Sequence, residues 1–259
     1  MIRLRNLVIA LVAVGLRWQL GSAVAAEEVT PQTFDAKGVK IHYLVEGTGE
    51  PVVLIHGLYS SVEMNWRIPG VISALAKGHQ VIALDLPGHG LSDNPDSEEA
   101  YGLRMVEDVI LLLDHLKIKK AHIVGYSMGG IVALKLIAQH PDRVLSAVLG
   151  GMGWLREGSP LQKSWQRMGV PKRSRTPAVC VHSISKLALT VEELKSIRIP
   201  VEVVIGDLDP SRRLYVRPLQ EVRKDWPVVE IEAAGHLNCI TRKEFRDEIA
   251  RWIDAHREQ

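Results

Sequence analysis

The sequence has no low-complexity tract and no repeat of fixed period, which argues against a disordered protein and against a solenoid. Cysteine is scarce, with Cys180 and Cys239 as the only two. In an oxidising compartment they could form one disulfide; two separate buried thiols are the alternative, because sequence gives no distance between them. Their spacing from the histidines is not that of a metal site. We expect neither a metal nor another cofactor.

The chain also lacks an apolar run long enough to span a bilayer comfortably. The apolar stretch at residues 7–16 follows a positively charged start and precedes small residues at 23–26 that suit cleavage. We predict that residues 1–26 are a cleaved signal peptide. The mature protein would then be periplasmic or secreted, with no integral membrane span. An uncleaved N-terminal membrane anchor is the alternative.

Neither sign of charge dominates the sequence. The formal net charge of +2 becomes −1 when Arg3, Arg5 and Arg17 leave with the leader. A nearly neutral mature protein gives no indication of a nucleic-acid partner. The length of 259 residues and an apolar share of 46% suit one domain with a substantial core, which we place at residues 27–259.

Short β-like runs alternate with amphipathic helical patterns, which predicts an α/β fold with a mostly parallel sheet and helices on both faces. Several runs are continuously apolar, as expected of strands buried on both faces. The expected strands span residues 39–45, 51–55, 80–84, 121–124, 145–149, 201–205 and 228–231. The expected helices span residues 62–76, 99–116, 128–139, 212–224 and 243–256.

One segment breaks this alternation. Residues 151–189 contain no convincing strand, several turn-forming residues and two tryptophans, Trp154 and Trp165. Because the segment lies between two sheet strands, we predict a short helical or irregular cap inserted over the site. Thr190 and Glu193 have the spacing of a capping box, which predicts the start of the helix that returns the chain to the sheet.

A Gly-x-Ser-x-Gly pattern spans residues 125–129, between an apolar strand and a helical pattern. In that context a sharp turn holds Ser127 at the top of the sheet, and the flanking glycines remove side chains that would clash. The amides at the start of the next helix face the charge that develops on the serine oxygen. Ser127 is therefore the predicted nucleophile.

A serine hydroxyl is a poor nucleophile and needs an adjacent base. His236 follows the last expected strand, and an imidazole can take the serine proton and return it to the leaving group. Asp209 follows the strand at 201–205 and is the acid predicted to fix the imidazole tautomer, with Asp207 as a turn former. The chain order Ser127, Asp209, His236 is the one expected after such an elbow.

An oxyanion formed by attack of that serine needs two backbone N–H donors. Met128, which follows the nucleophile, is expected to supply one. Leu58, in the loop after the strand at 51–55, is expected to supply the other. His56 is expected to bond this loop and to take no part in catalysis.

Together these motifs resemble the α/β-hydrolase superfamily over residues 39–256, and their shared order makes an accidental match very unlikely. The resemblance implies an α/β-hydrolase fold and the triad named above. The turn at residues 85–92 resembles a structural turn of that family and is given no catalytic role. The matching elements are His56-Gly57, Asp85-Leu86-Pro87-Gly88-His89-Gly90-Leu91-Ser92, the Ser127 elbow, residues 206–209 and Gly235-His236.

The residues at position 127 and at positions 56–59 disfavour particular branches of this superfamily. Serine at position 127 disfavours haloalkane dehalogenases and epoxide hydrolases, which use a carboxylate nucleophile there. His-Gly-Leu-Tyr at residues 56–59 disfavours the lipase and esterase branch with a His-Gly-Gly-Gly run. Similarity to small esterases and carbon–carbon bond hydrolases implies cleavage of a carboxylic ester or related acyl bond through an acyl-enzyme. The alternatives are carbon–carbon bond hydrolysis or acyl transfer with the same triad, and a non-catalytic or slow ligand receptor.

Charge is concentrated in the predicted cap, which carries seven basic residues and one acidic residue, a formal charge of +6. Its field could attract a small acyl substrate bearing a carboxylate or phosphate, or an anionic envelope surface. A solvated basic loop is the alternative. The seven are Arg156, Lys163, Arg167, Lys172, Arg173, Arg175 and Lys186.

Three aromatic residues are candidate substrate contacts. Tyr59 and Tyr126 flank the presumed oxyanion site in the sequence. Trp154 could line an acyl pocket beneath the cap or could pin the cap to the core.

Overall fold

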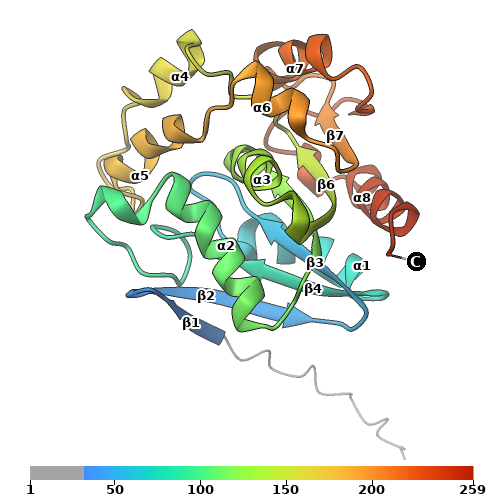
Figure 1. Cartoon of the computed structure of the whole chain (residues 1–259), viewed down its shortest axis with the longest axis horizontal. Helices are drawn as coiled ribbons and strands as arrows, with labels where there is room; N and C mark the ends of the chain where they lie inside the picture. The colour runs from blue at the N-terminus through green and yellow to red at the C-terminus, as the bar shows by residue number, and fades with distance from the viewer. Residues whose placement is uncertain (1–31, 259) are drawn as a thin grey trace, which may run out of the picture.

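The computed structural model describes residues 32–258 (Figure 1). The predicted signal peptide at residues 1–26 lies outside the described residues and stays a prediction. Within the described range, no helix combines the length and the apolar character needed to cross a bilayer.

Eight strands form one sheet in the order β1-β2-β4-β3-β5-β6-β7-β8. The β1–β2 and β2–β4 pairs are antiparallel and the other pairs are parallel, which confirms the predicted mostly parallel sheet. Parallel pairing brings the carboxyl ends of β3, β5, β7 and β8 to the same edge. The strands are β1 (Gln32–Ala36), β2 (Val39–Glu46), β3 (Glu50–Ile55), β4 (His79–Leu84), β5 (Ala121–Tyr126), β6 (Val144–Gly150), β7 (Val201–Gly206) and β8 (Val228–Ile231).

Two of the predicted helices are interrupted at a glycine. Gly70 has a φ of 76° and Gly102 a φ of 65°. This left-handed backbone ends a right-handed helix, so a π-helical turn precedes α1 and a 3₁₀ turn precedes α2. The α-helices are α1 (Val71–Leu75), α2 (Leu103–His115), α3 (Met128–Gln139), α4 (Pro160–Trp165), α5 (Ala178–Ser183), α6 (Val191–Ser196), α7 (Arg217–Val222) and α8 (Lys243–Ala255). The π-helical turns are Glu63–Arg67 and Arg212–Val216, and the 3₁₀ turns are Glu98–Ala100, Pro141–Arg143, Ile184–Leu187 and Cys239–Thr241.

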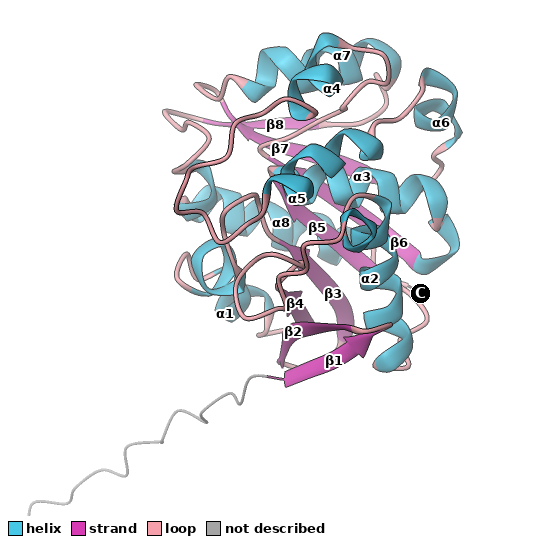
Figure 2. Cartoon of the chain, turned by 90° about the vertical axis from the view of Figure 1, so that its left-hand side faces the viewer, coloured by secondary structure: helices cyan, strands magenta, loops and turns pink. Residues whose placement is uncertain are grey.

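The sheet is buried on both faces, as its apolar runs predicted. Successive side chains of a strand point to opposite faces. In β3, Val53 and Ile55 belong to the core cluster that includes α2 and α3, whereas Val52 and Leu54 belong to the cluster that includes α1 and α8. Figure 2 shows α2 and α3 in front of the sheet and α8 behind it.

The first strand, β1, is not among the predicted strands. It lies at the sheet edge and pairs only with β2. Its buried positions are Phe34 and Ala36, and the residues between and before them are exposed and polar. An edge strand with one buried face gives a weak apolar signal. The sequence signal that could have indicated β1 is the Lys37-Gly38 pair, which forms the turn between β1 and β2. Both residues have positive φ, as in the two-residue turns of β-hairpins.

Residues 151–189 lie between β6 and β7 and carry α4, α5 and one isolated bridge, between Arg156 and Leu189. The predicted capping box is present at the start of α6. The Thr190 hydroxyl accepts a hydrogen bond from the Glu193 N–H at 3.0 Å, and the Glu193 carboxylate accepts one from the Thr190 N–H at 2.8 Å.

The two cysteines are separate thiols. Cys180 and Cys239 are both free and buried, so they form no disulfide and the second of the two alternatives holds. Burial raises the pKa of each thiol to about 12, which keeps both protonated at neutral pH.

Candidate active site

The predicted nucleophile lies on a strained turn between β5 and α3. Ser127 has φ 55° and ψ −119°, a backbone conformation that L-residues rarely adopt. Its N–H donates to the Gly150 carbonyl of the neighbouring strand β6 at 2.8 Å. This bond ties the turn to the sheet.

The two flanking glycines allow close packing of α3 against the sheet. A Cβ on Gly125 would lie 2.1 Å from the Gly129 carbonyl oxygen, and a Cβ on Gly129 would lie 2.0 Å from the Ile55 carbonyl oxygen. Both distances are far inside van der Waals contact. The pattern therefore brings the start of α3 against β3 and β5, with Ser127 on the bend between them.

The three predicted triad residues lie together. His236 Nε2 is 2.8 Å from Ser127 Oγ, and His236 Nδ1 is 2.7 Å from Asp209 Oδ2. Asp209 is buried, and its other carboxylate oxygen accepts the Ser211 N–H at 2.8 Å. Because an ionised carboxylate only accepts hydrogen bonds, Nδ1 carries the proton and Nε2 presents its lone pair to the serine hydroxyl. This is the protonation state that a general base requires.

A tyrosine holds the histidine loop in place. The Tyr126 hydroxyl donates to the His236 carbonyl at 2.6 Å, and the two rings lie 5.7 Å apart. Burial raises the pKa of Tyr126, so the phenol stays protonated and can donate. The prediction named Tyr126 as a substrate contact, and this positioning contact was missed.

The loop expected to carry the second oxyanion donor lies against the nucleophile. A Cβ on Gly57 would be 3.2 Å from the Ser127 Cβ, and the Gly57 N–H donates to Asn65 Oδ1 at 2.7 Å. Leu58 follows in the same loop, and Met128 is the first residue of α3, where helix amides have no intrahelical acceptor. Asn65 was not predicted, because no local sequence pattern marks a contact formed by the tertiary fold.

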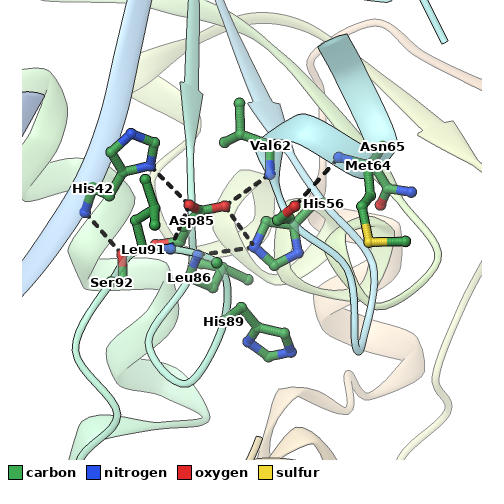
Figure 3. A network of polar contacts seen from close by, with 12 residues as sticks. His42, His56, Val62, Met64, Asn65, Asp85, Leu86, His89, Leu91 and Ser92 are labelled. Carbon is green, nitrogen blue, oxygen red and sulfur yellow. Dashed lines mark hydrogen bonds and ion pairs between the residues drawn. The ribbon is translucent and has the colours of Figure 1, made fainter. Parts of the chain in front are cut away.

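A polar network holds the neighbouring turn (Figure 3). Asp85 accepts hydrogen bonds from the backbone N–H groups of Val62 and Leu91, at 2.7 and 2.9 Å, and lies 2.8 Å from His42 Nδ1. Burial alone would raise the pKa of Asp85, but these hydrogen bonds and nearby His56 bring it below its usual range. The geometry fits the structural role that the resemblance implied for this turn.

His56 joins this network to the oxyanion loop. Its Nδ1 donates to the Gly57 carbonyl at 2.8 Å, and its Nε2 accepts the Leu86 N–H at 3.0 Å. Burial lowers the pKa of His56, and a neutral ring with one donor and one acceptor satisfies both contacts. His56 thus bonds the loop, as expected.

A pocket of about 400 Å³ opens beside the triad. Tyr59 and Tyr126, two of the predicted substrate contacts, are among its lining residues. Trp154 does not: it is buried, and its indole N–H donates to the Leu189 carbonyl at 2.9 Å. Of its two predicted roles, the contacts fit the one that fastens the cap segment to the core. The other lining residues are Gly57, Leu58, Ser60, Met64, Asn65, Ser127, His236, Leu237, Ile240 and Thr241.

The predicted cap contributes none of these lining residues. Five of its residues, Pro171, Arg173, Ser174, Arg175 and Thr176, line a neighbouring pocket instead. Among residues 32–258, no group of three or more His, Cys, Asp or Glu side chains is arranged to hold a metal ion.

Comparisons with known proteins agree with this architecture. The family model described as "alpha/beta hydrolase fold" matches residues 50–169. The enol-lactonase from Burkholderia xenovorans LB400 superposes with a TM-score of 0.71 at 23% identity, over 85% of this chain and 99% of that one. Epoxide hydrolase VrEH1 from Vigna radiata superposes with a TM-score of 0.70 at 19% identity, over 89% and 99%. The chain therefore has the α/β-hydrolase fold.

Curated relatives share sequence over about half of the chain. The dihydrolipoyllysine-residue acetyltransferase component of the acetoin cleaving system of Pseudomonas putida is 39% identical over 151 residues, which are 55% of this chain and 39% of that protein. The 2-hydroxymuconate semialdehyde hydrolase of Pseudomonas sp. (strain CF600) is 38% identical over 118 residues, 45% of this chain and 41% of that protein. The matches thus span about two fifths of these relatives.

Proposed function

We propose that this chain is a serine hydrolase that cleaves a carboxylic ester or related acyl bond of a small molecule through an acyl-enzyme on Ser127. The observation that carries the proposal is the hydrogen-bonded series from Asp209 through His236 to Ser127, with distances of 2.7 and 2.8 Å.

Each step of the proposed reaction has a group to perform it. His236 Nε2 takes the proton as Ser127 Oγ attacks the carbonyl carbon, and Asp209 stabilises the resulting imidazolium. The N–H groups of Leu58 and Met128 hold the oxyanion. His236 then gives the proton to the leaving group. His236 takes a proton from a water molecule as the water oxygen attacks the acyl carbon, and it gives that proton to Ser127 Oγ as the acyl–Oγ bond breaks and the acid leaves.

The pocket beside the triad favours an apolar group next to the reacting carbonyl. Leu58, Met64, Leu237 and Ile240 line it. Met64 and Leu237 are 60% and 88% exposed, so they form an apolar rim open to solvent. Apolar side chains with a few polar groups are typical of small-molecule sites.

The same residues also suit two related reactions. One curated relative is named as a semialdehyde hydrolase and another as an acetyltransferase component. Carbon–carbon bond hydrolysis and acyl transfer therefore remain the alternatives to ester cleavage, and the substrate decides among them. Other relatives are named as epoxide hydrolases and a haloalkane dehalogenase. Serine at position 127, where those classes use a carboxylate, argues against their chemistry here.

Hydrolysis of a panel of neutral 4-nitrophenyl esters of varied chain length, with a diketone as a second substrate class, tests the function. Ser127→Ala should reduce turnover by about a thousandfold or more, because it removes the nucleophile. Asp209→Asn should reduce kcat by on the order of ten-thousandfold through loss of the required tautomer. Ser164→Ala, which alters an exposed serine of α4, is the matched control and should retain activity.

Two results would overturn the proposal. One is ester hydrolysis by Ser127→Ala at the rate of the unmodified protein. The other is a folded protein that turns over no member of either substrate class, which would favour the ligand receptor.

We also propose that the protein is exported, on the strength of the leader pattern at residues 1–26. A retained N-terminal anchor remains the alternative. Mass spectrometry of the protein recovered from the cell envelope would separate the two, because cleavage near residue 26 removes the first 26 residues. As part of the same proposal, the basic predicted cap at residues 151–189 associates with an anionic surface of the cell envelope.

A further inference from the structure

A second pocket, of about 470 Å³, lies next to the pocket beside the triad. The two pockets have Tyr59 and Ser60 in common. These residues directly follow Leu58, the proposed oxyanion donor. A molecule whose carbonyl reaches Ser127 could therefore extend past Tyr59 into the second pocket.

The walls of the second pocket come from two segments. Pro171 and residues 173–176 of the predicted cap form one wall, and the turn Gly88-His89-Gly90 forms another. Hydrogen bonds fasten the walls together: the Thr176 hydroxyl donates to the Gly88 carbonyl at 3.0 Å, and Asn94 Nδ2 donates to the Arg175 carbonyl at 2.7 Å. The pocket is thus a built feature of the fold.

The lining carries positive charge and no carboxylate. Arg173 and Arg175 are the charged residues among its ten lining residues. Arg175 donates to the carbonyl oxygens of Gly90 and Ser92, at 2.7 and 2.6 Å. These neutral carbonyl acceptors orient the guanidinium but do not compensate its positive charge. Arg173 is exposed and forms no ion pair with a carboxylate among the described residues.

Two other basic residues of the cap are engaged elsewhere. Lys186 pairs with Glu98 at 2.6 Å, and the Arg156 guanidinium lies 5.9 Å from the centre of the Trp154 ring. The +6 charge of the cap is therefore not uniformly available. Of the remaining basic residues, Arg173 and Arg175 lie at the pocket, whose lining holds no carboxylate to pair with them.

We propose that the second pocket binds a terminal carboxylate on the acyl chain of the substrate, with Arg173 as the residue that determines this specificity. The inference rests on the proposed function, because the carboxylate is placed relative to a carbonyl at Ser127. Guanidinium groups bind carboxylates through charge-assisted and often bidentate hydrogen bonds. The substrate class is then an ester of a dicarboxylic acid with one free carboxylate.

Labelling of the serine by two fluorophosphonates of equal length tests the inference. One probe carries an alkyl chain that ends in methyl, and the other a chain that ends in carboxylate; several chain lengths are compared. The measured quantity is the second-order rate constant for labelling. Arg173→Gln should slow the carboxylate probe by about tenfold and leave the neutral probe within about twofold. Added salt should reduce the advantage of the carboxylate probe in the unmodified protein.

Arg167→Gln is the matched control, because Arg167 is a basic residue of the same segment that lines neither pocket. It should change neither rate. The neutral probe also reports whether each variant is folded. If the neutral probe labels every variant normally and Arg173→Gln leaves the carboxylate probe unaffected, or Arg167→Gln slows it equally, the anionic pocket is refuted while the serine hydrolase stands. If neither probe labels the unmodified protein, the proposed function fails and the inference falls with it.

Discussion

At the scale of single residues, the proposed chemistry depends on side chains that lie far apart in sequence. Ser127, Asp209 and His236 were predictable because each follows a recognisable strand and their order matches a known superfamily. Asn65 and the Tyr126 hydroxyl were not predictable as supports of the site. Their partners are backbone groups of Gly57 and His236, which only the tertiary structure brings near.

Tyr126→Phe should lower kcat by about tenfold and leave KM nearly unchanged. The variant keeps the ring but removes the hydrogen bond to the His236 carbonyl, and small misplacement of a base costs rate more than binding. Steady-state kinetics on one good ester measures both constants. The control is Tyr43→Phe in β2, which removes a hydroxyl that lies near His115 of α2. It should leave kcat unchanged. Equal effects of the two substitutions would assign Tyr126 a general structural role.

At the scale of elements, local patterns placed the strands and helices well except where geometry overrode them. The Pro69-Gly70 pair was a visible break inside the predicted helix at 62–76, and Gly102 was another at the start of α2. The apolar periodicity on both sides of each glycine masked the interruption. The edge strand β1 was missed because three of its five residues face solvent, so its apolar content is low.

Gly129→Ala should lower the free energy of unfolding by about 2 kcal/mol or more and reduce activity. A Cβ there would lie 2.0 Å from the Ile55 carbonyl oxygen, so α3 must move away from β3 and carry Ser127 with it. Denaturant unfolding measures the stability change. Gly169→Ala is the control, since a Cβ at Gly169 would meet nothing within 4 Å and this glycine lacks positive φ. Equally small losses of unfolding free energy in Gly129→Ala and Gly169→Ala would show that Gly129 is dispensable.

At the scale of the whole molecule, the sequence predicted one α/β domain and an uneven charge, and the fold places part of that charge beside the site. The sequence predicted a cap over the site but could not predict which of its residues line a pocket. Whether residues 173–176 line a pocket depends on contacts with residues 88–94, about eighty positions away, which no local pattern encodes.

Stability of the whole molecule should fall in acid, in part through His89. Burial lowers the pKa of His89 from 6.5 to about 3 in the folded protein, with a smaller contribution from the positive charge of Arg175. The unfolded chain therefore binds one more proton between pH 6.5 and 3. This contribution to stability is complete above pH 6.5 and is lost as the pH falls toward 3.

His89→Gln should flatten the acid dependence by up to about 1.4 kcal/mol per pH unit between pH 6 and 4. Urea unfolding at several pH values measures the slope for each protein. Comparing the unfolding free energies of the two proteins near pH 7 corrects for any change in packing that the substitution causes. An unchanged slope would show that His89 is not held neutral by the fold.

The central claim is that His236 activates Ser127 for covalent attack. The most direct measurement is peptide mapping by mass spectrometry after reaction with a neutral alkyl fluorophosphonate. One adduct on Ser127 is predicted, absent in Ser127→Ala and formed at least about a thousandfold more slowly in His236→Ala. An adduct on another residue, no adduct on folded protein, or equally fast labelling of His236→Ala would contradict the claim.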